Sequence, residues 1–276
     1  MEQYLWLIPL GFVLGTFGTL IGAGGGFVLV PILLLLYPRE SPEIITSISL
    51  AVVFINALSG SAVYARMRRI DYKSGLLFGT ATIPAAILGA STTAFIPRRL
   101  FYVVFGFLMI AASVVLMLRT SRRKEVGTEG TKGKIVRYGM VRYVVGADGK
   151  VHAFSYNPIV GVGLSLFIGY FSSLLGIGGG PIQVPALVHV LNFPVHIATA
   201  TSQFTLMIMA STGTLVHLSR GVFSHGVWRT VALGLGALLG AQLGARLSNH
   251  VHGEWIIRVL AIALGFVGVR IVLTAL

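Results

Sequence analysis

Two glycine-rich segments, far apart in the chain, carry the residues best suited to bind a ligand. They are residues 22–31 (GAGGGFVLVP) and 176–185 (GIGGGPIQVP), in which four glycines and a trailing proline coincide without a gap. A helix that begins just after a glycine-rich turn presents unpaired N–H groups and the positive end of its dipole. Such an end can hold an oxyanion without a full countercharge. The sequence therefore predicts anion contacts at Gly24, Gly25, Gly26, Gly178, Gly179 and Gly180.

Hydroxyl and amide side chains are the candidates for the remaining polar contacts. The main ones are Gln183, Ser47, Ser49, Thr201, Ser202 and Gln203, and the secondary ones are Asn56, Gln242 and Arg246. Any single hydroxyl could instead bond to a backbone carbonyl or pack between helices, as is common in membrane helices. The run at 201–203 favours binding, because a buried glutamine is costly unless it is used. Arg246 lies near an expected helix end, where its charge can instead reach the membrane surface.

The positions of the acidic residues indicate whether the ligand is an anion or a cation. All eight lie at the ends of apolar segments or in loops: Glu2, Glu40, Glu43, Asp71, Glu125, Glu129, Asp148 and Glu254. A cation carrier or proton pump usually keeps a carboxylate inside the membrane. The pattern therefore favours an anion over a cation. Three histidines leave proton coupling open, with packed or interfacial imidazoles as the alternative: His189, His196 and His217.

The elements that must position these residues are apolar helices. Of the 276 residues, 55% are hydrophobic and 11% are charged, with a mean hydropathy of +0.87. Soluble domains have about 25% charged residues, so the composition predicts an all-α, multi-pass integral membrane protein. The apolar segments are residues 5–36, 43–65, 74–95, 99–118, 157–192, 196–218, 226–247 and 254–275. The chain has no cysteine, which excludes disulfides and thiolate metal sites.

The first apolar segment of each half is longer than one membrane crossing needs. Residues 5–36 and 157–192 each exceed the roughly 20 residues that span a bilayer. Each is also interrupted by its glycine-rich motif, and glycine is a poor helix former. A broken backbone inside a membrane is tolerated only where it is buried in protein or lines a cavity. We therefore expect each half to begin with two short helices that meet at the motif.

Most of the net charge of +13 lies in short loops and in one polar connector, residues 119–156. This placement indicates contact with the membrane surface and argues against nucleic-acid binding. By the positive-inside rule the connector is cytoplasmic, in a protein of the cytoplasmic (inner) membrane. Within it, residues 141–145 and 151–154 flank a Gly-Ala-Asp-Gly-Lys turn and predict a β-hairpin. The hairpin could be a simple tether or could bind a partner.

The two halves repeat one pattern, which predicts a first repeat at 1–118, the connector at 119–156 and a second repeat at 157–276. Further short segments recur after both motifs, including Leu-Gly-Ala at 88–90 and again at 239–241. Four cations lie at 66–73, but the matching loop of the second half has chiefly Arg220, an asymmetry that favours inverted repeats. The doubled G-x-G-G-G-x-x-x-x-P element, on broken apolar segments, resembles the sulfite exporter TauE/SafE family.

That resemblance covers nearly the whole chain and implies a secondary transporter for sulfite, sulfonates or related sulfur oxyanions. Alternating access around a site at the glycine motifs is the expected mechanism. The resemblance implies no cofactor, and it leaves open the substrate, the direction, a proton or sodium coupling ion and a monomeric or homodimeric state. The sequence has no G-x-S-x-G, H-E-x-x-H or P-loop lysine pattern, so we do not expect an enzyme. The alternatives are a membrane scaffold, whose glycines merely pack helices, and an intramembrane enzyme.

Overall fold

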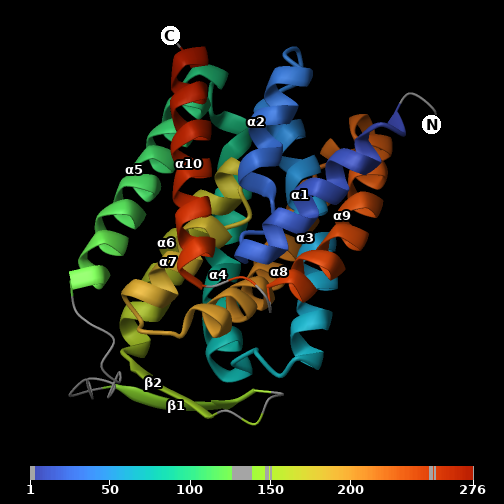
Figure 1. Cartoon of the computed structure of the whole chain (residues 1–276). Helices are drawn as coiled ribbons and strands as arrows, with labels where there is room; N and C mark the ends of the chain where they lie inside the picture. Colours follow the sequence, from blue (N-terminus) through green and yellow to red (C-terminus); the bar gives the residue numbers. More distant parts are fainter. Residues whose placement is uncertain are drawn as a thin grey trace.

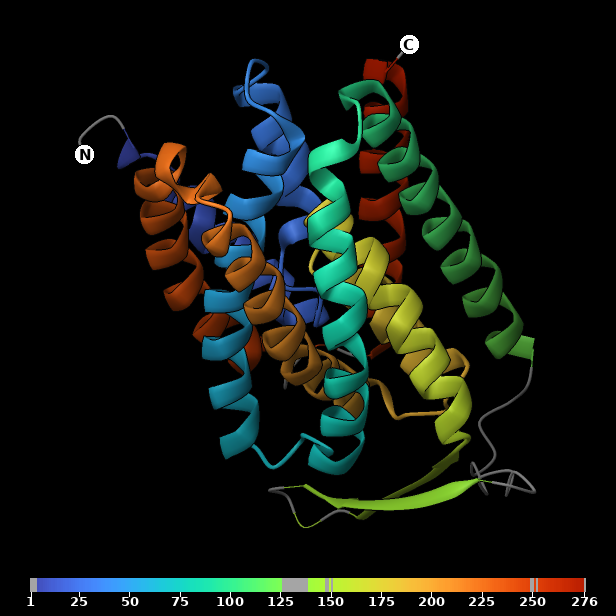
Figure 2. The same cartoon turned by 180° about the vertical axis from the view of Figure 1, so that it is seen from behind.

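The structure, a computed structural model, describes residues 4–125, 139–146, 149, 151–248, 251 and 253–275 (Figures 1 and 2). These residues form ten α-helices, two short 3-10 helices (Thr93–Phe95 and Val222–His225) and one two-stranded sheet. In chain order the main elements are α1 (Leu7–Ile21), α2 (Gly26–Leu36), α3 (Pro42–Arg66), α4 (Tyr72–Thr92), α5 (Arg98–Glu125), β1 (Met140–Val145), β2 (Val151–Tyr156), α6 (Pro158–Leu175), α7 (Gly180–His189), α8 (Val195–Ser219), α9 (Val227–Leu247) and α10 (Gly253–Ala275).

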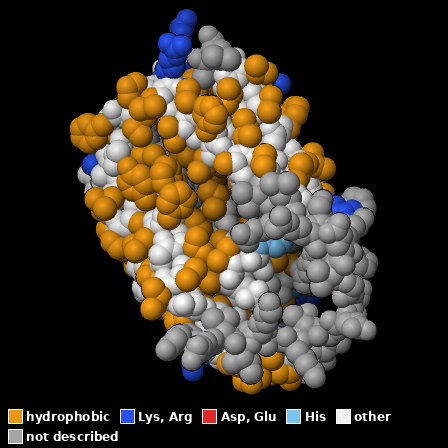
Figure 3. Space-filling model, turned by 90° about the vertical axis from the view of Figure 1, so that its left-hand side faces the viewer, with side chains coloured by type: hydrophobic (Ala, Val, Ile, Leu, Met, Phe, Trp, Pro, Cys, Tyr) orange, Lys and Arg blue, Asp and Glu red, His pale blue; other side chains and the backbone are white. Residues whose placement is uncertain are grey.

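This architecture confirms the predicted all-α membrane class. Among the described residues, four helical stretches are long and apolar enough to cross a membrane, judged by length and composition: Pro42–Arg66, Tyr72–Phe95, Pro158–Leu175 and Val227–Leu247. Large hydrophobic side chains are also exposed along many helices, as at Leu88, Phe107 and Phe266. One face of the molecule is covered largely by hydrophobic side chains, with Lys and Arg near its edges (Figure 3). Such a surface is stable in contact with lipid rather than water.

Both long first segments are broken at their glycine motifs, as predicted. The N-cap residue of α2 is Gly25, with φ 79°, and that of α7 is Gly179, with φ 75°. Other residues rarely adopt these positive φ angles, so glycine permits the sharp turn between the short helices. The sequence therefore places one interrupted helix pair, α1–α2 and α6–α7, at the start of each half.

The ends of the other helices follow ordinary capping chemistry, with one difference from the sequence-based boundaries. Ser41 caps α3 by accepting from the backbone N–H of Ile44, and Asn157 caps α6 in the same way. Helix α5, however, continues to Glu125, beyond the expected end at 118. Residues 119–125 contain no glycine or proline, so nothing in their sequence ends the helix at 118.

The helices pack in pairs that join the two halves. Helix α1 packs against α9, α6 against α4, and α5 against α10, while α3 and α8 contact each other at the centre. If each helix of the first half is exchanged for its counterpart in the second, this set of contacts is unchanged. Most of the interface is therefore formed between halves rather than within them.

Strands β1 and β2 form an antiparallel hairpin across one end of the helices, inside the connector (Figures 1 and 2). Arg142 of β1 forms an ion pair with Asp71, just before α4, at 2.5 Å between Nη2 and Oδ1. The Ser74 hydroxyl donates to Asp71 and lies 2.6 Å from the Tyr156 hydroxyl of β2. Thr201 of α8 accepts a bond from the backbone N–H of Asp71. Asp71 thus links the hairpin, the start of α4 and α8 of the other half.

Asp71 lies in a loop, as the sequence indicates, but its carboxylate is buried beneath the hairpin. Burial alone raises the pKa of this carboxyl. Hydrogen bonds from Arg142 and Ser74 more than offset that effect, so its pKa lies below the ordinary value. The paired, ionised form is therefore the one that stabilises the folded protein.

We predict that Arg142→Gln lowers the thermal unfolding midpoint more than Asp71→Asn does. Arg142→Gln leaves a buried carboxylate without its cation, which costs on the order of 3 kcal/mol. After Asp71→Asn, the partly exposed Arg142 can still reach water. Differential scanning fluorimetry of the purified protein measures both, and the double variant should resemble Asp71→Asn. Equal midpoints for the two single variants would contradict the burial argument.

The same ion pair predicts an acid-sensitive step. Since the folded-state pKa of Asp71 is depressed, its stabilisation is present above the ordinary pKa of about 3.9 and is lost as pH falls through the folded value. The unfolding midpoint of the wild type should therefore drop more steeply below about pH 4 than that of Asp71→Asn. Parallel pH profiles for the two proteins would show that the pair contributes nothing.

Candidate functional site

The two glycine motifs lie against each other. A Cβ placed on Gly26 would lie 2.5 Å from the carbonyl oxygen of Ile177, and one placed on Gly180 would collide with the Cα of Ala23. No side chain fits in this contact, so the two turns pack backbone to backbone. The starts of α2 and α7 are therefore brought together from opposite halves of the chain.

The two helix starts differ in the N–H groups that they offer. At α2, the N–H groups of Val28 and Leu29 donate to the carbonyl of Gly25, and in the described part of the chain those of Gly26 and Phe27 have no acceptor. At α7, Gly180 donates to the carbonyl of Gly178, and proline follows it and has no N–H. Neither start has a side-chain cap. The first motif thus offers more backbone donors for an anion.

Two serines hold the glycine turns from the opposite halves. The Ser49 hydroxyl of α3 donates to the carbonyl of Gly176 at 2.6 Å, and the Ser202 hydroxyl of α8 donates to the carbonyl of Gly22 at 3.0 Å. Both serines are buried. Each half therefore fixes the turn of the other, and these two predicted residues do lie at the motifs.

A buried amide network lies beside the first turn. The Gln203 side-chain NH2 group donates to Asn56 Oδ1 at 2.9 Å, and the Thr19 hydroxyl donates to the same oxygen at 2.9 Å. The Asn56 amide in turn donates to the carbonyl of Gly15. Gln203 Oε1 is buried and accepts no hydrogen bond from the described residues. Gln203 and Asn56 thus form one polar cluster that spans α3 and α8.

A second set of buried polar groups lies on α6 and α7. Both amide atoms of Gln183, and the hydroxyls of Ser172 and Ser173, have no hydrogen-bond partner among the described residues. A Cβ placed on Gly179 would lie 3.2 Å from the Ser172 hydroxyl, so this oxygen borders the second turn. An unsatisfied buried polar group costs roughly 1–3 kcal/mol, and such groups cluster where a protein binds polar ligands or water.

Other predicted residues lie apart from the motifs. The Ser47 hydroxyl bonds to the carbonyl of Ile44 in its own helix, which is the local alternative for a membrane serine. Thr201 faces the loop at Asp71. Gln242 and Arg246 line an exposed groove between α3 and α9. Gln183 lies in the first turn of α7, where its backbone N–H donates to the carbonyl of Gly179. The structure therefore brings the six motif glycines together with Ser49, Asn56, Gln183, Ser202 and Gln203, and it separates Ser47, Thr201, Gln242 and Arg246 from them.

Sequence reasoning missed Thr19, Ser172 and Ser173. A signal was present, because Thr19 and Ser173 precede the first glycine of their motifs by the same three positions. Both residues are buried, and their side chains border Gly60 of α3 and Gly213 of α8, respectively. Matching the two halves residue by residue before the motifs, and not only after them, would have found this pair.

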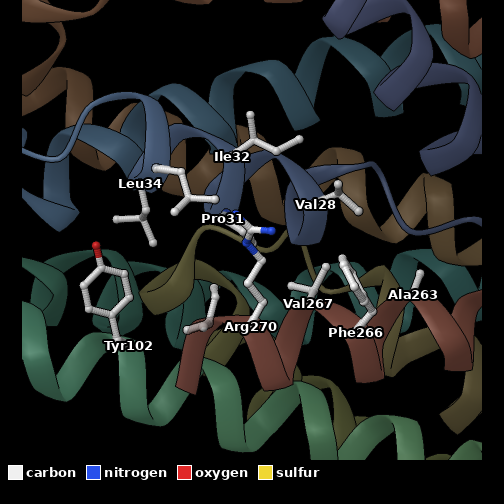
Figure 4. A pocket seen from close by; sticks show the side chains of 11 residues that line it. Val28, Pro31, Ile32, Leu34, Tyr102, Ala263, Phe266, Val267 and Arg270 are labelled. Atoms are coloured by element: carbon white, nitrogen blue, oxygen red, sulfur yellow. The ribbon is translucent and has the colours of Figure 1, made fainter. Parts of the chain in front are cut away.

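An apolar cavity of about 420 Å³ lies between α2, α5 and α10 (Figure 4). Pro31 of the first motif lines it, and Arg270 extends from α10 toward that proline. Its other walls are almost entirely aliphatic or aromatic. A small inorganic anion needs several polar contacts to replace its hydration, so this cavity suits it less well than the polar centre at the turns.

Known proteins are similar to this chain over nearly its whole length. The family model for "Sulfite exporter TauE/SafE" matches residues 7–271. The chain is 32% identical over 277 residues to the probable membrane transporter protein YunE of Bacillus subtilis (strain 168), covering 98% of this chain and 97% of that protein. It is 22% identical to the probable membrane transporter protein MJ0441 of Methanocaldococcus jannaschii, covering 98% and 97%.

A third relative is the probable membrane transporter protein YdhB of Bacillus subtilis (strain 168), 25% identical over 88% of this chain and 89% of that protein. No solved structure matches the chain. The family model spans both glycine motifs and nearly all of the helices described above. This chain therefore belongs to the sulfite exporter TauE/SafE family of membrane transporters.

Proposed function

We propose that this protein is a secondary transporter that moves a small sulfur-containing anion, such as sulfite or a sulfonate, across the cytoplasmic membrane. The observation that carries the proposal is the direct contact between the two glycine turns, each held by a serine from the opposite half. The family description supplies the sulfur oxyanion class. The free N–H groups at α2, the Gln183 NH2 group and the hydroxyls of Ser172 and Ser173 supply donors of the right kind.

The distribution of buried charges supports an anionic substrate. Among the described residues, Asp71 is the one buried carboxylate, and Arg142 neutralises it at the hairpin end of the bundle. The polar centre itself contains only glycine backbone, hydroxyls and amides. The turn carbonyls of Gly176 and Gly22 already accept hydrogen bonds from Ser49 and Ser202, so the free carbonyl acceptors that remain for a cation in the described chain are the amide oxygens of Gln183 and Gln203. The free donors are more numerous: the Gln183 NH2 group, the hydroxyls of Ser172 and Ser173, and the N–H groups at the start of α2. An anion can use the donors that are left over.

Alternating access by two inverted repeats is the mechanism that we propose. The chain leaves α2 at one end of the bundle and α7 toward the opposite end, and α5 begins where α10 ends (Figure 1). The exchange symmetry of the helix contacts fits the same arrangement. The repeats would be residues 1–118 and 157–276, with 119–156 on the cytoplasmic side. Rocking of one repeat against the other would open the glycine contact to each side in turn.

The second candidate is a membrane scaffold without transport. It is favoured by one observation, which is that Cβ atoms placed on several glycines outside the motifs would also meet protein backbone. Gly11 lies against Leu233, and Gly240 lies against Phe12, in the packing of α1 on α9. Glycines of this kind allow close approach of helices and need no ligand.

A variant with a negative charge at the polar centre distinguishes a transporter from a scaffold. We predict that Gln203→Glu reduces sulfite flux into proteoliposomes by at least about tenfold, because the new carboxylate repels an anion at close range. The matched control is Asn192→Asp, the same amide-to-acid change at an exposed loop position, which should transport normally. A glycine variant is less decisive, since Gly25→Val would also strain the turn and press on Leu14. Normal flux in Gln203→Glu would reject this site.

Ligand-dependent stability tests the substrate class. The panel for the purified protein is sulfite, sulfate, thiosulfate, taurine, sulfoacetate, phosphate and chloride. A ligand that binds only the folded state adds about 2.7 kcal/mol at a hundredfold excess over its dissociation constant. We expect a selective rise in unfolding midpoint with one sulfur anion, and its loss in Gln203→Glu. A panel in which every anion acts alike, in both proteins, would favour the scaffold.

A further inference from the structure

A groove of about 860 Å³ lies on the outer surface between α3 and α9, away from the glycine turns. Its walls along most of its length are aliphatic, including Ile55, Leu58, Val231 and Leu235. Several of these side chains are exposed, with Leu58 at 49% and Leu235 at 54%. The groove therefore offers a long apolar surface that opens outward from the bundle.

One end of the groove is cationic. Arg66 is the last residue of α3 and Arg246 lies in the last turn of α9, and both line the groove together with Gln242. Both arginines are exposed. Three other arginines of the described residues have carboxylate partners, which are Asp71 for Arg142, Glu43 for Arg220 and Glu40 for Arg229. Neither groove arginine forms an ion pair with any described residue.

We propose that this groove binds one anionic phospholipid. The headgroup phosphate would lie between Arg66 and Arg246, with Gln242 as a further donor, and an acyl chain would lie along Leu58 and Leu235. Arginine donates two parallel hydrogen bonds to phosphate oxygens, so two arginines at one mouth make a specific phosphate site. Basic pockets between helices at the cytoplasmic surface are typical sites for anionic headgroups.

The shape and charge together favour a lipid over the other occupants. A free phosphate or sulfate would use the arginines but leave the aliphatic part of the groove unexplained. A second copy of the chain in a twofold dimer would set this patch against itself and bring like charges together. A phospholipid fits both parts of the groove, because its charged headgroup can lie at the arginines while its apolar chain lies along the aliphatic walls. Its binding would also join α3 of one half to α9 of the other.

Native mass spectrometry of the detergent-solubilised protein, with added phosphatidylglycerol, tests this site. The wild type should bind one lipid tightly, and Arg66→Gln/Arg246→Gln should bind it at least about tenfold more weakly. The matched control, Arg68→Gln/Lys73→Gln, removes the same charge from exposed positions at the same end of α3 and the start of α4, outside the groove. Its affinity should match that of the wild type.

A second variant tests the apolar half and does not depend on charge. Leu235→Trp fills the groove while both arginines remain, and it should lose the bound lipid but keep its thermal unfolding midpoint. Equal affinity for phosphatidylglycerol in the wild type and the double arginine variant would overturn the proposal. So would equal binding of zwitterionic phosphatidylcholine, or a lipid-free dimer that Leu235→Trp dissociates. None of these outcomes bears on whether the glycine turns bind a sulfur anion.

Discussion

The contact between the two glycine-rich turns is the constraint on which the rest of the structure depends. Gly26 lies against Ile177, and Gly180 lies against Ala23, too closely for any side chain. This distance sets how near α2 and α7 can start to each other. It also places α3 and α8 so that Ser49 and Ser202 reach the turn of the opposite half. A larger residue in the contact would separate the halves and break both hydrogen bonds.

The same constraint explains why chemistry is concentrated at the centre of an otherwise apolar bundle. Helices interrupted inside a membrane expose backbone groups that must be satisfied by protein or by a ligand. Here serines satisfy the turn carbonyls, whereas N–H groups at the start of α2 and the amides of Gln183 and Gln203 keep unused hydrogen-bonding capacity. The glycine turns thus serve both to pack the two halves together and to bind a ligand. In the proposed transport cycle they would alternate between these two roles.

Local signals in the sequence were sufficient for the helix breaks, because runs of glycine act through the backbone of the same residues. They were also sufficient for the membrane class, which is confirmed. The side-chain contacts depend instead on how each helix is rotated against its neighbours. Thr201 and Ser202 are adjacent in the chain, yet one faces Asp71 and the other faces Gly22. Gln242 and Arg246 likewise lie on the outer side of α9, and the Arg142–Asp71 pair joins residues that no local pattern connects.

The most direct test of the central claim is access to the glycine contact from each side of the membrane. The chain has no cysteine, so Ser202→Cys introduces a single thiol at a fully buried position beside Gly22. An impermeant thiol reagent is applied to sealed vesicles of each orientation, with Lys73→Cys as a control for one-sided access. The account predicts labelling of Cys at 202 from both sides and of the control from one side. Labelling at 202 from one side only, or from neither, would contradict alternating access at the glycine turns.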